Sequence, residues 1–542
     1  MTKKRILMCA ESSLVPSGFG NYTREILSRL YKTNKYEIAE LSCFRNPDHP
    51  KKEPWKVYPV AVKPTDPLFK DYQANSANQF GLWRYEFALL DFKPHIVFDI
   101  RDFWYFTYQE TSPLRPFYHW IIAPTYDSEP QKIDTLNTFK NADIVAFHTE
   151  WAKQDLIKQN YYNNINIGPV VSDSVDPSIF KPLEYPKEHH KLKNSIPSDA
   201  FIIGSVMRNQ KRKLIPNLFK ILQSLLEKNN RKIFLYLHTS YPDIASWDIP
   251  ILLLQYGVMD NVLLSYHCNN CKNYNISTFQ GTSKTCETCN KQSMIMCSTN
   301  NGITPSQLNE IYNVFDIYVQ YAICEGFGIP VVEAASAGIP IITVDHGAMA
   351  EVGKNVDGDL VPIKTEFTEL ETGAYRIYPD DDQCQQLIQQ YIDMSSDSLV
   401  KKSKSTRQHL LQNYSWDKTA KVFEDMFDRI DINQKLSWDS LRRNINDNFT
   451  IDNSLDNRSL VYYYVDNIIN EPWLKSTNFI EELIKGLDVG YMSNGNQLVI
   501  FNKANALQKL EAYAKNKMAF ESIRCGSATF SDRIQNFLRY GE

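Results

Sequence analysis

The sequence predicts an α/β protein with two parallel-sheet domains, a cysteine-bearing insertion and a small α+β module near the C-terminal end. Three observations predict this class. Short apolar strands alternate with helical segments over about the first 180 residues, and the alternation restarts near residue 201. A Pro- and Lys-rich stretch at 176–199 separates the two regions. With 542 residues the chain is too long for one compact core, so two or three domains are expected.

The composition is that of a globular protein rather than a membrane protein. Hydrophobic residues make up 43% and charged residues 23% of the chain, and no stretch approaches the roughly 20 apolar residues of a membrane span. The apolar run at 6–10 is too short for a signal-peptide core, so a cytoplasmic location is expected. The net charge of -4 comes from 59 basic and 63 acidic residues, and this balance does not indicate a polyanionic partner for the chain as a whole.

The first domain is expected to span 1–183. Its first strand, 5–9, leads into a turn that contains Gly18 and Gly20, after which Asn21 can cap a helix running toward Leu30. The remaining elements of this domain follow in the order strand 36–41, strand 95–100, strand 120–124, strand 143–147 and helix 150–159.

The second domain is expected to span 184–412, followed by a crossover helix at 413–432 and an accessory module at 433–542, where Asn and Asp become frequent. Its elements are predicted, in order, as strand 201–207, helix 214–228, strand 233–238, helix 248–256, strand 262–266, helix 305–315, a strand ending at Tyr321 and helix 381–394.

An insertion at 266–298 carries two cysteine pairs, Cys268 with Cys271 and Cys286 with Cys289. Without a secretion signal, paired thiols at this spacing favour metal ligation over disulfides. Four thiolates are the usual ligands of tetrahedral Zn²⁺, and a site with all four positions filled leaves none for a reacting group. The sequence therefore predicts a structural Zn²⁺ in a ribbon-like insertion, with His267 and Cys297 as substitute ligands if one cysteine is misassigned.

Two acids flank a glycine turn in the string Glu325-Gly-Phe-Gly-Ile-Pro-Val-Val-Glu333. A buried strand precedes it, and Pro330 suits the first position of a helix, where its missing N–H costs nothing. The two glycines let a backbone approach a ligand, and the helix start offers unpaired N–H groups that suit phosphate. Glu333 is expected in the first helical turn, where it could hold a ribose diol. The alternative is that Glu333 only complements the positive helix end.

The whole string resembles the signature of retaining glycosyltransferases of family 4. Four further segments support the resemblance: the glycine turn at 17–20, the linker string at 175–182, the loop at 204–213, and Ser415-Trp416 before the last predicted helix. The resemblance covers roughly residues 1–430 and implies the GT-B fold, in which two Rossmann-like domains face each other across a cleft.

The resemblance also implies roles for individual residues. The donor, a nucleotide-diphosphate sugar, would be bound by Gly18, Gly20, Arg208, Lys213, Gly326, Phe327, Gly328 and Glu333. Glu325 would contact the donor sugar, while Arg208 and Lys213 would stabilise the departing diphosphate, so no catalytic metal is expected. Retention would proceed by front-side attack, with a covalent intermediate on Glu325 as the alternative.

One segment departs from the family pattern. Many members place a His after a strand of the first domain, near the reacting carbon, whereas this chain has Asp127 there. Asp127 could orient the sugar or accept a proton, or it could simply cap the following helix. His148 is the nearest alternative for a group at the reacting carbon.

The leading functional hypothesis is a hexosyl- or pentosyltransferase whose acceptor is a glycan, a lipid, a protein or DNA. A rival is a nucleic-acid-binding protein on a degenerate transferase body, with the ribbon and the weakly basic tail at 501–542 as the contact surface. Only Lys272 and Lys284 lie between the cysteine pairs, which is few cations for a phosphate contact. The two hypotheses merge if the acceptor is modified DNA. The donor sugar, the acceptor and the oligomeric state are left open by the sequence.

Overall fold

A computed structural model describes residues 3–15, 17–66, 69–112, 114–160, 164–243, 246–297 and 302–438, and five short strands beyond them. These strands are β19 (Val461–Tyr464), β20 (Val489–Tyr491), β21 (Gln497–Ile500), β22 (Arg524–Cys525) and β23 (Ala528–Thr529). Of the predicted accessory module at 433–542, the structure describes only residues 433–438 and these five strands.

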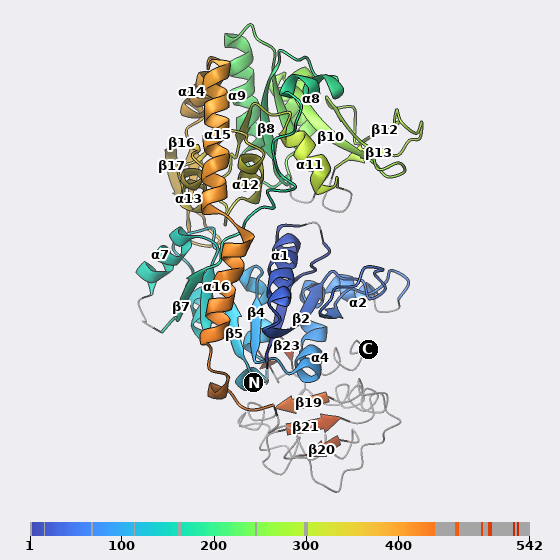
Figure 1. Ribbon diagram of the computed structural model, residues 1–542, viewed down its shortest axis with the longest axis vertical. Coiled ribbons are helices and arrows are strands. Elements are labelled where there is room, and N and C mark those ends of the chain that lie inside the picture. The colour runs from blue at the N-terminus through green and yellow to red at the C-terminus, as the bar shows by residue number, and fades with distance from the viewer. Residues whose placement is uncertain are drawn as a thin grey trace.

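Two parallel sheets dominate the chain, one in each half of the molecule (Figure 1). The first has the strand order β3-β2-β1-β4-β5-β6-β7, and all its neighbouring pairs are parallel. Its strands are β1 (Lys4–Glu11), β2 (Tyr36–Cys43), β3 (Lys56–Pro59), β4 (Ile96–Asp99), β5 (His119–Ile122), β6 (Ile144–Phe147) and β7 (Ile167–Val170). The helices of this half are α1 (Gly18–Thr33), α2 (Phe69–Ala74), α3 (Ser76–Gln79), α4 (Leu82–Phe92), α5 (Thr107–Glu110), α6 (Ile133–Asn141) and α7 (Glu150–Gln159).

Helices cover both faces of the first sheet, which explains why its strands are apolar throughout. In β1, Ile6 and Met8 pack into one buried cluster with residues of α1, while Leu7 and Cys9 pack into another with residues of α4. Successive side chains of a strand point to opposite faces, so a strand covered on both sides must be continuously apolar.

The second sheet has the order β12-β13-β10-β9-β8-β14-β15-β16, with β11 paired to β10. Its strands are β8 (Phe201–Val206), β9 (Ile233–His238), β10 (Val262–Cys268), β11 (Tyr274–Ser277), β12 (Ser283–Lys284), β13 (Met294–Met296), β14 (Ile317–Val319), β15 (Ile341–Val344) and β16 (Asp359–Val361). Its helices are α8 (Lys187–Lys193), α9 (Ile215–Lys228), α10 (Ile249–Tyr256), α11 (Pro305–Tyr312), α12 (Ile329–Ser336), α13 (Gly347–Asn355), α14 (Asp381–Ile392) and α15 (Ser396–Asn413).

The cysteine-bearing insertion extends this second sheet. Strand β10 is parallel to β9, whereas β11, β12 and β13 are antiparallel additions. Because β10 continues to Cys268, the first cysteine lies at the end of a core strand rather than in a separate loop.

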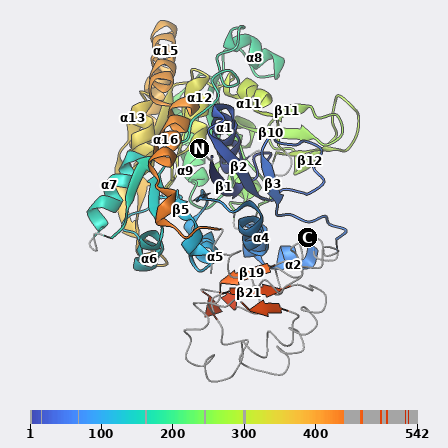
Figure 2. The same cartoon turned by 60° about the horizontal axis from the view of Figure 1, so that its bottom comes forward.

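Helix α16 (Trp416–Arg429) follows α15 but packs on the first half of the chain (Figures 1 and 2). Its apolar side, including Phe423 and Phe427, joins the buried cluster that contains α1 and β1. The Lys4 ammonium donates hydrogen bonds to the carbonyls of Phe427 and Ile430, at 2.7 Å each. The chain therefore passes from the first half to the second and back.

The α/β fold class is confirmed, and several predicted bounds need correction. Helix α1 begins at Gly18, and its N-cap is Ser17 rather than Asn21, because the Ser17 hydroxyl accepts the Gly20 N–H. Pro330 is the second residue of α12, not the first. An antiparallel hairpin, β17 (Ile363–Thr368) with β18 (Tyr375–Pro379), was not predicted. In the part of the chain that the structure describes, no helix is long and apolar enough to cross a membrane.

Candidate active site

The two sheets place their functional loops at points where the strand order reverses. In the first sheet the reversal lies between β1 and β4, and in the second between β8 and β14. Open parallel sheets bind ligands at such points, beyond the carboxyl ends of the strands. The loop after β1 carries the turn at Gly18, the loop after β8 carries Arg208 to Lys213, and the loop after β14 carries Glu325.

Glu325 lies among three donors. Its Oε2 accepts a hydrogen bond from the Arg212 guanidinium at 2.7 Å, and its Oε1 accepts one from the Gln320 amide at 2.8 Å and also contacts the Lys213 ammonium. Glu325 is 8% exposed and Lys213 is 6% exposed. Burial and the adjacent Arg212 lower the pKa of Lys213, and Cys324 opposes this shift only in part.

Backbone contacts fix this cluster. A β-bridge joins Lys213 to Ala322, and the Ile323 N–H donates to the Arg212 carbonyl at 2.8 Å. The two loops are therefore held to each other, so the ammonium and the carboxylate are positioned before any ligand arrives.

Arg208, by contrast, is not part of the Glu325 cluster. Its guanidinium pairs with Asp243 through two hydrogen bonds, at 3.0 and 3.2 Å, and its side chain is 52% exposed. Of the two cations predicted from the sequence to bind the diphosphate, Lys213 contacts Glu325. Arg208 is held by Asp243 and would have to leave this partner to contact a ligand.

The glycine turn before α12 has the expected backbone. Gly328 is the N-cap residue and has φ of 99°, a left-handed conformation that L side chains rarely adopt. A Cβ at Gly326 would lie 2.7 Å from Thr125 Cγ2 of the first half. The turn therefore leaves backbone N–H groups at a helix start and lies directly against the other half of the molecule.

Glu333 is the fifth residue of α12, so the prediction that it lies in the first helical turn is wrong. Its carboxylate accepts a hydrogen bond from the Tyr312 hydroxyl at 2.8 Å, and the residue is 8% exposed. Burial raises the pKa of Glu333 to about 7, although the Tyr312 hydrogen bond opposes the shift. Complementing the positive helix end does not account for this acid, because that effect is confined to the first turn.

The turn at Gly18 and Gly20 faces α12 from the first half. A Cβ at Gly18 would lie 2.7 Å from Ile329 Cδ1, and a Cβ at Gly20 would lie 2.2 Å from the Val15 carbonyl oxygen. The first glycine therefore permits close approach of the two halves, and the second permits the tight turn itself.

Asp127 bridges the two halves rather than capping the following helix. Helix α6 has Lys132 as its N-cap residue and no side-chain cap. The Asp127 carbonyl accepts a hydrogen bond from Arg376 of the hairpin at 2.9 Å, and its carboxylate lies 3.6 Å from the Cys324 thiol, one residue before Glu325.

His148, the sequence-based alternative to Asp127, is 5% exposed. Its Nδ1 lies 2.8 Å from the Asp173 carboxylate, and its ring meets Tyr22 edge-on. Burial alone would lower the pKa of His148, but Asp173 more than offsets this, so the net shift is upward. No described contact links His148 to Glu325 or Asp127.

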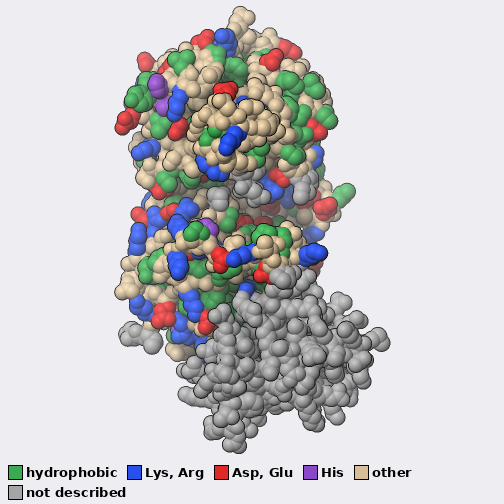
Figure 3. Space-filling view, turned by 90° about the vertical axis from the view of Figure 1, so that its right-hand side faces the viewer, with side chains coloured by type: hydrophobic (Ala, Val, Ile, Leu, Met, Phe, Trp, Pro, Cys, Tyr) green, Lys and Arg blue, Asp and Glu red, His purple; other side chains and the backbone are tan. Residues whose placement is uncertain are grey.

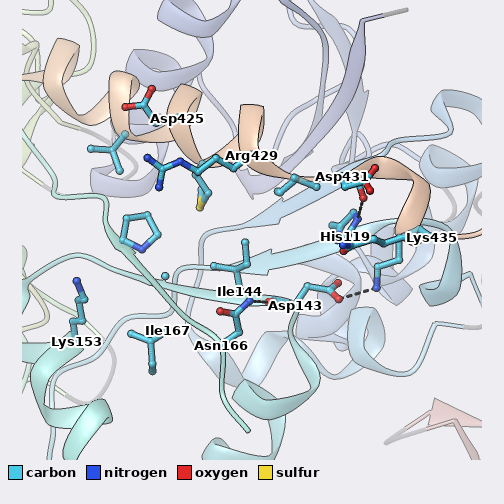
Figure 4. A pocket seen from close by; sticks show the side chains of 16 residues that line it. His119, Asp143, Ile144, Lys153, Asn166, Ile167, Asp425, Arg429, Asp431 and Lys435 are labelled. Atoms are coloured by element: carbon cyan, nitrogen blue, oxygen red, sulfur yellow. Dashed lines mark hydrogen bonds and ion pairs between the residues drawn. The ribbon is translucent and has the colours of Figure 1, made fainter. Parts of the chain in front are cut away.

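A pocket of about 650 Å³ lies beside this cluster, and Arg212, Cys324 and Asp127 form part of its lining. A second pocket, of about 820 Å³, lies at the opposite edge of the first sheet, between the amino ends of β5 to β7 and helix α16 (Figure 4). There Lys435 is paired with Asp143 at 2.7 Å, and a His119 ring nitrogen lies 3.0 Å from the Asp431 carbonyl oxygen. The smaller pocket adjoins Glu325 through Arg212 and Cys324.

The four cysteines of the insertion converge. Their Sγ atoms all lie within 4.8 Å of one another, with Cys268 to Cys289 and Cys271 to Cys286 each at 3.6 Å. Thiolates at about 2.3 Å from a tetrahedral ion lie roughly 3.8 Å apart, so the arrangement fits a bound metal. The cluster includes neither His267 nor Cys297, so neither substitute ligand is needed.

Charges of both signs are interspersed on the described part of the face shown in Figure 3, which includes no extended basic surface. This agrees with the balanced composition of the chain.

Sequence reasoning missed four residues of the site. Arg212 lies within the basic loop, but the sequence did not distinguish its role from those of its neighbours. Gln320, Tyr312 and Arg376 belong to no motif that predicts a functional role, because their partners are distant in the chain. Their contacts are with Glu325, Glu333 and Asp127.

Comparison with known proteins supports this description. Residues 291–393, which contain Glu325, the glycine turn and Glu333, match the family model described as glycosyl transferases group 1. No curated protein matches the chain.

Solved structures resemble the chain over its two-sheet body. Sucrose-phosphate synthase from Thermosynechococcus elongatus is 13% identical, with a TM-score of 0.57 over 79% of this chain and 99% of that one. A glycosyltransferase from Rickettsia africae is 14% identical, with a TM-score of 0.52 over 79% and 98%. Anabaena HepE in complex with UDP and glucose is 10% identical, with a TM-score of 0.53 over 79% and 100%. These likenesses show the GT-B fold, and with the group 1 match over the acid motif they indicate that the chain is a glycosyltransferase enzyme.

Proposed function

We propose that the chain is a retaining glycosyltransferase of family 4 that moves a sugar from a nucleotide-diphosphate sugar to an acceptor hydroxyl. Residues 184–412 would hold the donor, and residues 1–183 would face it from the acceptor side. The observation that carries the proposal is the convergence of Glu325, Lys213 and Arg212 at the strand-order reversal of one sheet. The Gly18 turn of the other half lies against Ile329, at the start of the helix that follows Glu325.

Each group has a role that its position supports. The N–H groups of Gly326, Phe327 and Gly328 and the Lys213 ammonium would bind the diphosphate, whose negative charge grows as the sugar leaves. Arg208 would join them by leaving Asp243. Glu325 would hold hydroxyls of the donor sugar, with its orientation fixed by Gln320 and Arg212.

Glu333 would accept hydrogen bonds from the ribose diol, for which it must be ionised. UDP is a reasonable first nucleotide to test, because HepE was solved in complex with UDP and glucose and an E. coli neighbour with UDP-2-fluoro glucose.

In the proposed front-side displacement, the acceptor oxygen bonds to the anomeric carbon on the face from which the diphosphate oxygen departs. The bond between that carbon and the phosphate oxygen breaks, and the acceptor proton passes to the same phosphate oxygen. The configuration of the carbon is thereby retained. Asp127, on the other side of Cys324, would orient the acceptor hydroxyl.

We further propose that the four cysteines hold a structural Zn²⁺. The ion would join the two Cys-x-x-Cys turns, and the insertion is tied to α11 by the Tyr274 hydroxyl, which donates to Glu310 at 2.8 Å. Helix α11 also carries Tyr312, the hydrogen-bond partner of Glu333. The insertion would therefore help to position Glu333, the proposed ribose ligand, rather than groups at the reacting carbon.

Purified protein tested against UDP-, GDP- and ADP-sugars checks the main proposal. We expect one of these donors to bind in calorimetry and to be hydrolysed or transferred, and we expect Glu325→Gln to abolish turnover while retaining nucleotide binding. Lys421→Gln, an exposed change on α16, is the matched control and should leave both unchanged. Failure of every donor to bind would refute the proposal, as would full turnover by Glu325→Gln.

A further inference from the structure

We propose that the pocket of about 650 Å³ beside Glu325 is the acceptor subsite and that it takes a sugar ring of a carbohydrate acceptor. The acceptor role rests on the proposed function. The pocket lies mostly in the second half of the chain, between the start of α9, the end of α10 and the β17–β18 hairpin, and Asp127 is its contribution from the first half. This subsite therefore narrows the acceptor side proposed above: residues 1–183 would supply Asp127, and the donor half would supply the remaining walls.

The pocket adjoins the place where the donor sugar would lie. Arg212 lines it and also donates to the Glu325 carboxylate at 2.7 Å. Cys324 lines it one residue before Glu325, and its thiol lies 3.6 Å from the Asp127 carboxylate. A hydroxyl of a sugar ring bound in this pocket would therefore contact both Asp127 and the loop that carries Glu325.

The hairpin builds one wall of the pocket. Phe367 on β17 and both Arg376 and Tyr378 on β18 line it, and the Phe367 and Tyr378 rings are stacked with centroids 5.0 Å apart. Arg376 and Tyr378 are two residues apart, so they point to the same face of β18. Arg376 is held by Asp127 and by Glu369, which also line the pocket.

The part of the lining at and before α10 is also aromatic and polar. Trp247 and Tyr256 line it, together with the amide of Gln255. The Trp247 ring is fixed, because its Nε1 donates to the Lys213 carbonyl at 2.7 Å and the Lys211 ammonium lies 4.1 Å from the ring centroid. The lining thus combines flat apolar rings with carboxylate, guanidinium and amide groups.

This combination suits a sugar, which has apolar C–H faces and a rim of hydroxyls that both donate and accept hydrogen bonds. A nucleic-acid strand fits less well. Arg376 is shared by two acids and Arg212 is bound to Glu325, so among the described lining residues Lys211 is the cation without a carboxylate partner. One such cation does not make the basic track that a phosphodiester backbone requires.

The chain offers a matched pair of variants for the test. Tyr378 lines the pocket and is 44% exposed, whereas Tyr375 lies on the same strand, points to the other face, is 45% exposed and does not line the pocket. Both can be replaced by alanine, and neither belongs to the proposed donor machinery.

The experiment is saturation-transfer difference NMR on the full chain with methyl glycosides of glucose, galactose, mannose and xylose, each with and without UDP. We expect at least one glycoside to bind, Tyr378→Ala to weaken its binding about fivefold, and Tyr375→Ala to leave it unchanged. Calorimetry with UDP alone should give the same affinity for all three proteins.

Three outcomes would overturn the proposal: no glycoside binds, Tyr378→Ala binds as well as the unaltered chain, or a thymidine oligonucleotide binds in a Tyr378-dependent manner while the glycosides do not. The UDP measurement distinguishes failure of the acceptor-pocket proposal from failure of the proposed glycosyltransferase function. If UDP binds and the glycosides fail, the acceptor pocket is wrong and the donor site stands, whereas failure of every nucleotide sugar refutes the proposed function itself.

Discussion

Nucleotide-sugar binding is expected to weaken as the pH falls through neutrality, because the proposed role of Glu333, holding the ribose, requires an ionised carboxylate. Burial of this carboxyl raises its pKa to about 7. About nine tenths of the groups are then ionised at pH 8 and about one tenth at pH 6, so the dissociation constant should rise about tenfold between these values, or ~1.4 kcal/mol.

Calorimetric titration with UDP-glucose checks this expectation from pH 6 to pH 8. The diphosphate of this ligand is esterified at both ends, so the ligand itself does not titrate in that window. The variant Glu333→Gln should bind more weakly than the unaltered chain at pH 8 and should show no tenfold change with pH.

Glu333→Gln also provides a check that does not depend on the ligand. A carboxyl whose pKa is higher in the folded than in the unfolded chain makes folding less favourable as the pH rises from about 4.5 to about 7. Glu333→Gln should therefore raise the melting temperature more at pH 8 than at pH 5. A pH-independent affinity in the unaltered chain, or an unchanged pH slope in Glu333→Gln, would refute the assignment of Glu333 to the ribose.

Three further predictions concern other parts of the site. Lys213→Met should lower kcat by about 10² to 10³ in a donor-turnover assay, because it removes a buried cation from beside Glu325, and equal kcat values would contradict that role. Gly18→Ala should raise KM for the donor, since its Cβ would lie 2.7 Å from Ile329 Cδ1, and Ile329→Ala should restore KM if the contact between the halves is the cause. Cys286→Ser should lower the zinc content measured by atomic emission from about one ion per chain to well below that value, and equal zinc content in both proteins would exclude this cysteine as a ligand.

Periodicity located most elements of the fold, but not all of them. The helix predicted at 150–159 and the strand predicted at 233–238 have the bounds that the structure gives them. These segments are bounded by clear caps or polar residues, so local rules suffice. The β17–β18 hairpin was missed because β17, Ile363–Thr368, is short and mostly exposed, so its alternation of Ile363 and Phe367 with charged residues is a weak signal.

The candidate site was only partly predictable for a related reason. Gly326, Gly328 and Lys213 lie in short sequence motifs. The residue types in these motifs are enough to predict a glycine turn and a positive charge. Arg212 could not be distinguished from its basic neighbours, because what sets it apart is a hydrogen bond to a carboxylate 113 residues away in the chain. The helical turn of Glu333 depended on where α12 begins, and a shift of one residue at that boundary was enough to misplace it.

The sequence by itself determined the α/β class, the two cysteine pairs and the acid motif, because strand and helix periodicity, Cys-x-x-Cys turns and glycine turns are local properties. Only the tertiary structure decided which groups meet. The order of strands in each sheet brings the loops after β8 and β14 together, and the contact of Gly18 with Ile329 brings the other half against them. The physical reason is that backbone conformation follows from neighbours in the chain, whereas the pairing of Glu325 with Lys213, and of Asp127 with Arg376, depends on packing between segments that are far apart in the sequence.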